Sequence, residues 1–134
     1  MRFTLLLLCM LLVGCGSGSP YSYQKARGKI TYEDGSALPG GTVLRFVAQD
    51  APAVPGATPR PALANADANG EFDCVTSYKF GDGLIKGKHK VVIEVSPNAK
   101  PVVPKEYTTA ATTPLIVDTA ESPFELKVPR PKTK

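Results

Sequence analysis

Glycine and proline interrupt this chain so often that no long helix fits into it. After the first 14 residues, the longest stretches that contain neither residue are 42–51 and 71–80, ten residues each. A typical helix needs about 11–12 residues, whereas a strand needs only about 5–6. Gly and Pro supply 12 and 13 of the 134 residues, and the hydrophobic fraction of 43% is too high for a disordered chain. The sequence therefore predicts one small all-β domain.

The N-terminal residues have the pattern of an export signal. Arg2 precedes an apolar run at residues 5–13. As a helix, this run would be about 14 Å long, half of a hydrocarbon core of about 30 Å, so it is too short to span a membrane. Its length and basic start are typical of the apolar region of a secretory signal.

The apolar run ends in Leu12-Val13-Gly14-Cys15, which resembles the bacterial lipobox. This resemblance implies that residues 1–14 are a lipoprotein signal peptide and that Cys15 is the lipidated first residue of the mature chain. Two or three acyl chains on one residue anchor a protein stably. The alternative is an ordinary secretory signal whose cleavage site contains a cysteine.

The residues after Cys15 predict where the protein is held. Residues 15–24 are expected to form a lipidated flexible tether, because Gly, Ser and Pro dominate its first half. Gly16 resembles the pattern that is sorted to the outer membrane. The expected location is the cell envelope, lipid-anchored at the outer membrane on its periplasmic or surface face.

The distribution of charge argues against nucleic acid as a partner. Four basic side chains lie in the last eight residues, which leaves the rest of the body near neutral: Lys127, Arg130, Lys132 and Lys134. A near-neutral body in an exported chain disfavours nucleic-acid binding. Residues 130–134 are expected to form a basic tail, either solvated or in contact with anionic lipid or cell-wall polymer.

Segments of alternating apolar residues lie between the turn signals. They predict seven short strands, near residues 28–32, 42–48, 63–66, 71–76, 89–95, 115–117 and 124–128. The side chains predicted to face inward are Ile30, Tyr32, Leu44, Phe46, Phe72, Cys74, His89, Val91, Ile93, Val95, Leu115, Val117, Phe124, Leu126 and Val128. Residues 50–61 contain four prolines and are predicted to be a surface loop, and residues 67–70 a hairpin turn. Short strands at this spacing are typical of a two-sheet sandwich.

Four motifs, in this order, resemble the carboxypeptidase regulatory-like domain, which is transthyretin-like (prealbumin-like) in fold. They are residues 28–41 (GKITYEDGSALPGG), Leu44-Arg45-Phe46, residues 66–72 (ADANGEF) and residues 87–91 (GKHKV). The resemblance runs from residue 24 to about residue 128 and is strongest to bacterial lipoproteins that carry this domain. It implies a seven-stranded antiparallel Greek-key β-sandwich over residues 25–129, without an active site.

The residue types predict no catalytic or metal-binding constellation. His89 is the only histidine, and its parity with Val91 predicts a buried, structural role. Cys74 shares parity with Phe72, which favours burial over a reactive thiol. Residues 67–70 open like a calcium loop but lack its downstream Glu. We expect no enzyme activity, no cofactor and no metal; the alternative is a hydrolase that uses Cys74 or His89.

The expected function is therefore that of a non-enzymatic, lipid-anchored envelope module with a structural or a ligand- or protein-binding role. Its expected partners are the membrane, through the lipid anchor, and an envelope protein or glycan. A second alternative is docking to cell wall or membrane through the basic tail. The candidate contact surfaces are the loops at residues 50–61, 78–87 and 96–114. The candidate binding residues in these loops are Tyr78, Lys79, Phe80, Asp82 and Tyr107.

Overall fold

The computed structural model describes residues 18–95 and 98–133 of the chain. The predicted signal peptide, Cys15 and Gly16 lie outside the described residues. Within the described part of the chain, no helix has the length and apolar character needed to cross a membrane.

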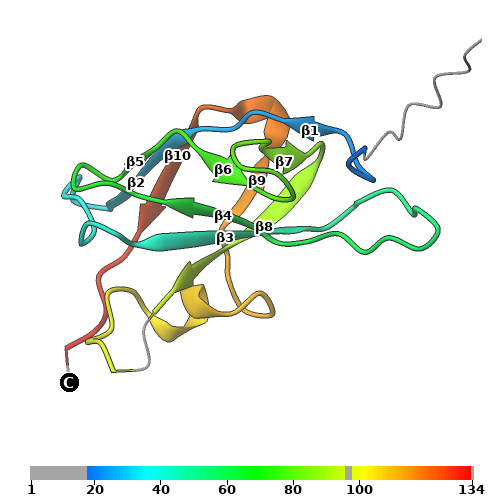
Figure 1. Cartoon of the computed structure of the whole chain (residues 1–134). Coiled ribbons are helices and arrows are strands. Elements are labelled where there is room, and N and C mark those ends of the chain that lie inside the picture. The colour runs from blue at the N-terminus through cyan, green and yellow to red at the C-terminus, as the bar shows by residue number, and fades with distance from the viewer. Residues whose placement is uncertain (1–17, 96–97, 134) are drawn as a thin grey trace, which may run out of the picture.

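The described residues form short strands and two short 3₁₀ helices (Figure 1). The elements are β1 (Tyr23–Gln24), β2 (Gly28–Tyr32), β3 (Val43–Ala48), β4 (Ala62–Asn65), β5 (Glu71–Phe72), β6 (Val75–Thr76), β7 (Leu84–Ile85), β8 (Lys88–Glu94), η1 (Lys105–Thr108), β9 (Ile116–Asp118), η2 (Thr119–Glu121) and β10 (Phe124–Val128). The prediction of an all-β domain is thus confirmed for the described residues. Residues 50–61 contain no strand, as their prolines predicted.

Two larger sheets pack face to face around the core. One has the strand order β6-β4-β3-β8-β9 and the other the order β10-β2-β5, while β1 and β7 form a separate antiparallel pair. This pair corrects two predictions, because β1 lies inside the predicted tether (residues 15–24) and β7 inside the predicted loop (residues 78–87). Two residues per strand are too few for alternation to reveal either strand. The ring of Phe46 in β3 packs against the rings of Phe72 in β5 and Phe124 in β10, with centroids 6.0 and 6.3 Å apart. These three aromatic rings join both sheets in one core, which is the packing of a β-sandwich.

The predicted alternation holds in the longer strands. In β10, Phe124, Leu126 and Val128 are buried, whereas Glu125 and Lys127 are exposed. Strands β2 and β3 also bury the predicted side chains, and the predicted inward side chains of β8 are buried at His89, Val91 and Ile93. Burial of one face of each strand fixes these registers, because a shift by one residue would expose the whole apolar set.

The segment at residues 71–76 differs from its prediction as one strand. The chain forms β5, which pairs with β2, and then crosses at Asp73 and Cys74 to form β6, which pairs with β4 in the other sheet. This crossing breaks the alternation, so Val75 is buried while Cys74 is only half-buried. The prediction that Cys74 points inward with Phe72 was therefore wrong.

The turn before this segment is present but does not close a hairpin within one sheet. The amide of Gly70 donates to the carbonyl oxygen of Asp67 over 3.0 Å, and the amide of Asp67 donates to the carbonyl oxygen of Glu71 over 2.9 Å. The flanking strands β4 and β5 belong to different sheets. Strand β4 also begins one residue earlier than predicted and buries Ala62 and Ala64.

Two further predictions on strands are corrected. Val95 was expected inside but is 37% exposed, because β8 ends at Glu94. Val92 is instead fully buried, and η1 contacts β8.

Strand β10 pairs with β2 in parallel, so the sandwich is not antiparallel throughout. Alternation specifies which face a side chain occupies but not the direction of the neighbouring strand, so the sequence pattern gave no sign of this pairing.

Candidate functional site

Three segments meet at one end of the body, and we call this surface the tether end (residues 21–25, 50–61 and 77–83). The hydroxyl of Tyr21 donates to the carbonyl oxygen of Ala57 over 3.4 Å, and Lys25 Nζ donates to the carbonyl oxygen of Gly81. The guanidinium carbon of Arg60 lies 5.1 Å from the centre of the Tyr78 ring. The described chain begins at this end, beside the long loop between β3 and β4 (Figure 1).

Asp82 organises the loop at residues 77–83. Its carboxylate accepts hydrogen bonds from the backbone amides of Ser77, Tyr78 and Lys79 over 2.7, 2.9 and 2.8 Å. Burial raises the pKa of this carboxyl, but the hydrogen bonds from Lys79, Ser77 and Tyr78 outweigh burial and lower the pKa below its ordinary value. The predicted binding residue Asp82 thus holds the loop in shape and directs its oxygens into the loop.

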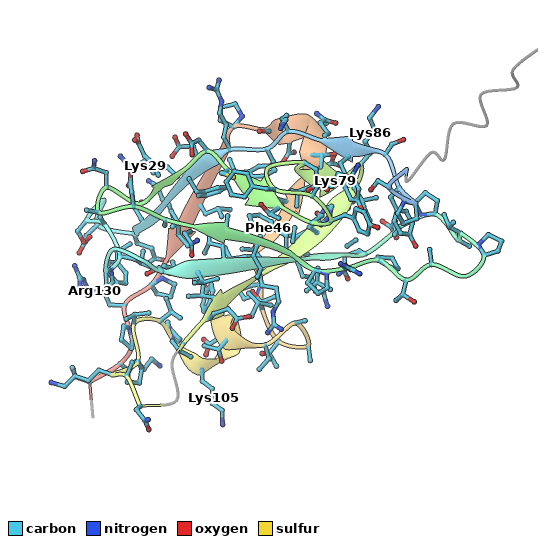
Figure 2. All side chains as sticks on the ribbon, viewed as in Figure 1. Lys29, Phe46, Lys79, Lys86, Lys105 and Arg130 are labelled. Carbon is cyan, nitrogen blue, oxygen red and sulfur yellow. The ribbon has the colours of Figure 1, made fainter. Side chains whose placement is uncertain are left out.

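The loop that Asp82 holds presents aromatic and cationic side chains to solvent. Phe80 is 89% exposed, the largest value among the exposed large hydrophobic residues of the described chain, and Tyr78 is 42% exposed. Lys79 and Lys25 lie on the same surface. Figure 2 places Lys79 and Lys86 at the end of the body where the N-terminal trace leaves it. An exposed aromatic ring on the same surface as two lysines suits the boundary between water and an anionic apolar surface.

Tyr107 does not belong to this surface. It lies in η1, which Figure 1 shows on the far side of the five-stranded sheet from β2 and β10. Its ring is half-buried and packs against the core, and burial, followed by the charges of Glu106 and Glu33, raises the pKa of its hydroxyl. The structure therefore brings Tyr78, Lys79, Phe80 and Asp82 together and leaves Tyr107 apart.

A groove of about 730 Å³ lies near η1, between the chain that follows β8 and the chain that follows β10. Half of the residues that line it are proline or valine, and the charged residues Lys105, Glu106, Arg130 and Lys132 line it as well. Prolines that cannot donate backbone hydrogen bonds leave such a wall largely apolar. The groove is separate from the tether end.

The residues considered for hydrolysis are not arranged as a nucleophile and base. His89 is 3% exposed, and its Nδ1 lies 3.3 Å from the carbonyl oxygen of Gly87. Burial lowers the pKa of the imidazole, opposed by this hydrogen bond and by Asp118. Cys74 is half-buried, with its Sγ near Gly81, and no hydrogen bond among the described residues joins it to His89. Nor do three or more His, Cys, Asp or Glu residues of the described chain gather as a metal site would require.

Arg130 has a role that the sequence did not indicate. Its guanidinium carbon lies 4.2 Å from the centre of the Tyr32 ring, Nε donates to Asp34 Oδ2 over 3.1 Å, and Nη2 donates to Ser36 Oγ over 2.6 Å. The two hydrogen bonds from Ser36, followed by the one from Arg130, lower the pKa of Asp34 to about 2. The first residue of the predicted basic tail is thus bound to the turn after β2. A basic residue after an apolar strand is too common a pattern to predict this contact.

In comparisons with known proteins, no family model, no curated protein and no solved structure matches this chain.

Proposed function

We propose that this protein is a non-enzymatic, lipid-anchored module of the cell envelope, held through Cys15 and built on a β-sandwich with a structural or binding role. The observation that carries the proposal is the order of the N-terminal residues. A basic start, an apolar run too short to span a bilayer, a small residue and a cysteine precede a segment rich in Gly and Ser. We further propose that the sandwich is a carboxypeptidase regulatory-like domain with a seven-stranded Greek-key core.

The length of the tether supports a role close to the lipid surface. Tyr21 is buried against the body and Tyr23–Gln24 form β1, so the tether is residues 16–20, which span at most about 18 Å when fully extended. The tether joins the body at Tyr21, and Lys25, directly after β1, donates to the carbonyl oxygen of Gly81 in the loop that carries Phe80. An anchor at Cys15 would therefore hold the tether end toward the membrane and the groove near η1 away from it.

Acylation of Cys15 is tested by labelling the full chain with radioactive palmitate in cells and following the label and the membrane fraction. We expect the wild-type chain to be labelled and to sediment with membranes. The substitution Cys15→Ser should abolish the label, because residue 15 then has no thiol to accept the acyl-glycerol group. The unlabelled chain should either leave the membrane fraction or stay there as an uncleaved precursor.

The chain supplies two matched controls for this experiment. Cys9→Ser changes the cysteine of the apolar run, and Cys74→Ser changes the cysteine of the body. Both variants should keep the label and the membrane association. Label that persists in Cys15→Ser, or a mature form whose residue 15 is not acylated by mass spectrometry, would disprove the anchor.

A further inference from the structure

Strand β10 lies at the edge of its sheet with backbone groups that no other strand uses. It pairs with β2 on one side only, in the order β10-β2-β5. The amide of Phe124 donates to the carbonyl oxygen of Arg27 over 2.9 Å, and the carbonyl oxygen of Val128 accepts from the amide of Glu33 over 3.0 Å. In a parallel pair, every second residue directs both its N–H and its C=O to the same neighbour. Glu125 and Lys127 therefore direct theirs away from β2.

The outward backbone groups of β10 have no partner in the described part of the chain. No hydrogen bond of the described residues involves the amide or carbonyl group of Glu125 or Lys127 on that side. Both side chains are exposed, while Phe124, Leu126 and Val128 are buried and hold the strand rigidly against the core. An ordered edge of this kind is a template for another strand.

Prolines limit the strand that such an edge accepts. Pro123 and Pro129 flank β10 directly, and neither has an N–H group to donate. Pairing is thus confined to residues 124–128, and only Glu125 and Lys127 present backbone groups there. An incoming strand must therefore place, opposite Glu125 and Lys127, residues whose N–H and C=O groups point toward β10.

We propose that β10 pairs in antiparallel orientation with β10 of a second copy of this chain, in the register centred on Leu126. In that register, Leu126 lies opposite its own counterpart, and Glu125 lies opposite Lys127 of the second copy. Both members of each such pair direct N–H and C=O toward the other chain, so each pair exchanges two hydrogen bonds. Opposite charges also face each other in both pairs, which stabilises an antiparallel ladder.

The other registers that match the orientation of the backbone groups are unfavourable. Centred on Glu125, the pairing places Glu125 opposite its own counterpart and Lys127 opposite Pro123. Centred on Lys127, it places two lysines opposite each other and Glu125 opposite Pro129. Each of these registers therefore combines like charges with a missing amide donor. A register centred between two residues would place Glu125 and Lys127 of one copy opposite Phe124, Leu126 or Val128 of the other. The backbone groups of these three residues already pair with β2, so no hydrogen bonds could form between the copies.

The charges on the outer face of the three-stranded sheet extend this pattern. Glu71, Lys29 and Glu125 lie side by side in register across β5, β2 and β10. Their signs alternate, and the pairing centred on Leu126 continues the alternation with Lys127 of the second copy. A second copy of this chain therefore matches this edge in backbone orientation, length and charge.

The proposal is tested on the full chain in a non-ionic detergent, by sedimentation over a range of protein concentrations at low salt. We expect a monomer–dimer equilibrium for the wild type. Glu125→Lys and Lys127→Glu each place like charges in both pairs and should weaken the dimer by about tenfold or more. The double variant E125K/K127E restores opposite charges and should restore the wild-type dissociation constant.

Two further measurements complete the experiment. Thermal unfolding of each variant tests folding. Both substituted side chains are exposed, so all three variants should unfold cooperatively, with a small decrease in melting temperature in the two variants that carry Glu125→Lys, because Lys29 lies beside this position in β2. Zero-length carbodiimide coupling of the wild-type dimer, followed by mass spectrometry, should join Glu125 of one copy to Lys127 of the other. A wild-type monomer at every concentration, equal dimerisation of all variants, failure of the double variant to recover, or cross-links between the two copies that join only other residues would each overturn the pairing.

Discussion

Gly70 is the residue at which the turn after β4 meets the other sheet most closely. Its φ is +79°, and its carbonyl oxygen accepts from the amide of Ile30 over 2.8 Å. A Cβ at this position would lie 2.1 Å from the carbonyl oxygen of Ile30, which is backbone and cannot rotate away. The close approach of turn and strand therefore requires glycine, for its conformation and for its lack of a side chain.

We predict that Gly70→Ala destabilises the fold by more than the about 1–3 kcal/mol that backbone strain alone costs. Gly35→Ala is the matched control, because Gly35 has a similar φ of +86° but open space around it. Chemical denaturation of both variants measures the difference. Equal losses of unfolding free energy would show that the contact with Ile30 does not constrain the turn.

His89 makes the stability of the fold depend on pH. Burial lowers the pKa of its imidazole below the ordinary value of 6.5, so the unfolded chain binds the proton more tightly than the folded chain. Stability should therefore fall as the pH drops below 6.5 and should go on falling until the lower, folded pKa is passed. We predict a smaller loss between pH 7.5 and pH 5 for His89→Gln than for the wild type, measured by denaturant titration. A parallel loss in both proteins would contradict the assignment.

At the scale of elements, the sequence pattern predicted the longer strands better than the short ones. Strand β10 alternates over five residues, so the buried face was evident from Phe124, Leu126 and Val128. Strands β5 and β6 have two residues each, which is too few for a period, and the crossing at Cys74 was missed. The direction of β10 and the contact of Arg130 with Tyr32 arise from tertiary packing, which alternation does not encode.

The sequence pattern predicted the candidate site in part. The loop with Tyr78, Lys79 and Phe80 was found because aromatic and basic residues stand together between Gly and Ser. The separation of Tyr107 from this loop was not predictable, since it depends on which side of the five-stranded sheet η1 covers. The role of Asp82 in holding its own loop was also missed, although an acidic residue between two glycines is typical of a tight turn.

An ion pair between Asp34 and Arg130 joins the turn after β2 to the chain after β10. Hydrogen bonds from Ser36 and Arg130 lower the pKa of Asp34 from 3.8 to about 2. The ionised carboxylate is favoured by folding, so its contribution is complete above pH 3.8 and disappears as the pH falls to about 2. We predict that Asp34→Asn has a lower melting temperature than the wild type at pH 6 and that the two proteins converge near pH 2. A difference that persists at pH 2 would argue against the ionised pair.

On the scale of the whole molecule, the proposed anchor and the proposed β10 pairing reinforce each other. A strand pair of five residues is a small contact, so the dimer should dissociate readily in dilute solution. Two chains anchored in one membrane are held at a high effective concentration, which favours a weak contact without any new interaction. The edge of β10 is then suited to pair copies that already share a lipid surface.

An anchor at Cys15 also predicts which end of the body lies nearest the lipid. The chain contains no tryptophan, so a single introduced tryptophan reports on its own surroundings. Phe80→Trp places the reporter at the tether end, and Lys105→Trp places it in η1, which Figure 2 shows at the opposite side of the body from Lys79 and Lys86.

We predict that brominated lipids quench the fluorescence of the Phe80→Trp variant in vesicles strongly and that of Lys105→Trp weakly. The reason is geometric, because a tether of five residues before Tyr21 holds the 77–83 loop within reach of the bilayer, and an aromatic ring favours the interface. Removing the acyl chains should abolish the difference between the variants. Equal quenching of both reporters in the anchored protein would mean that the body tumbles freely on its tether.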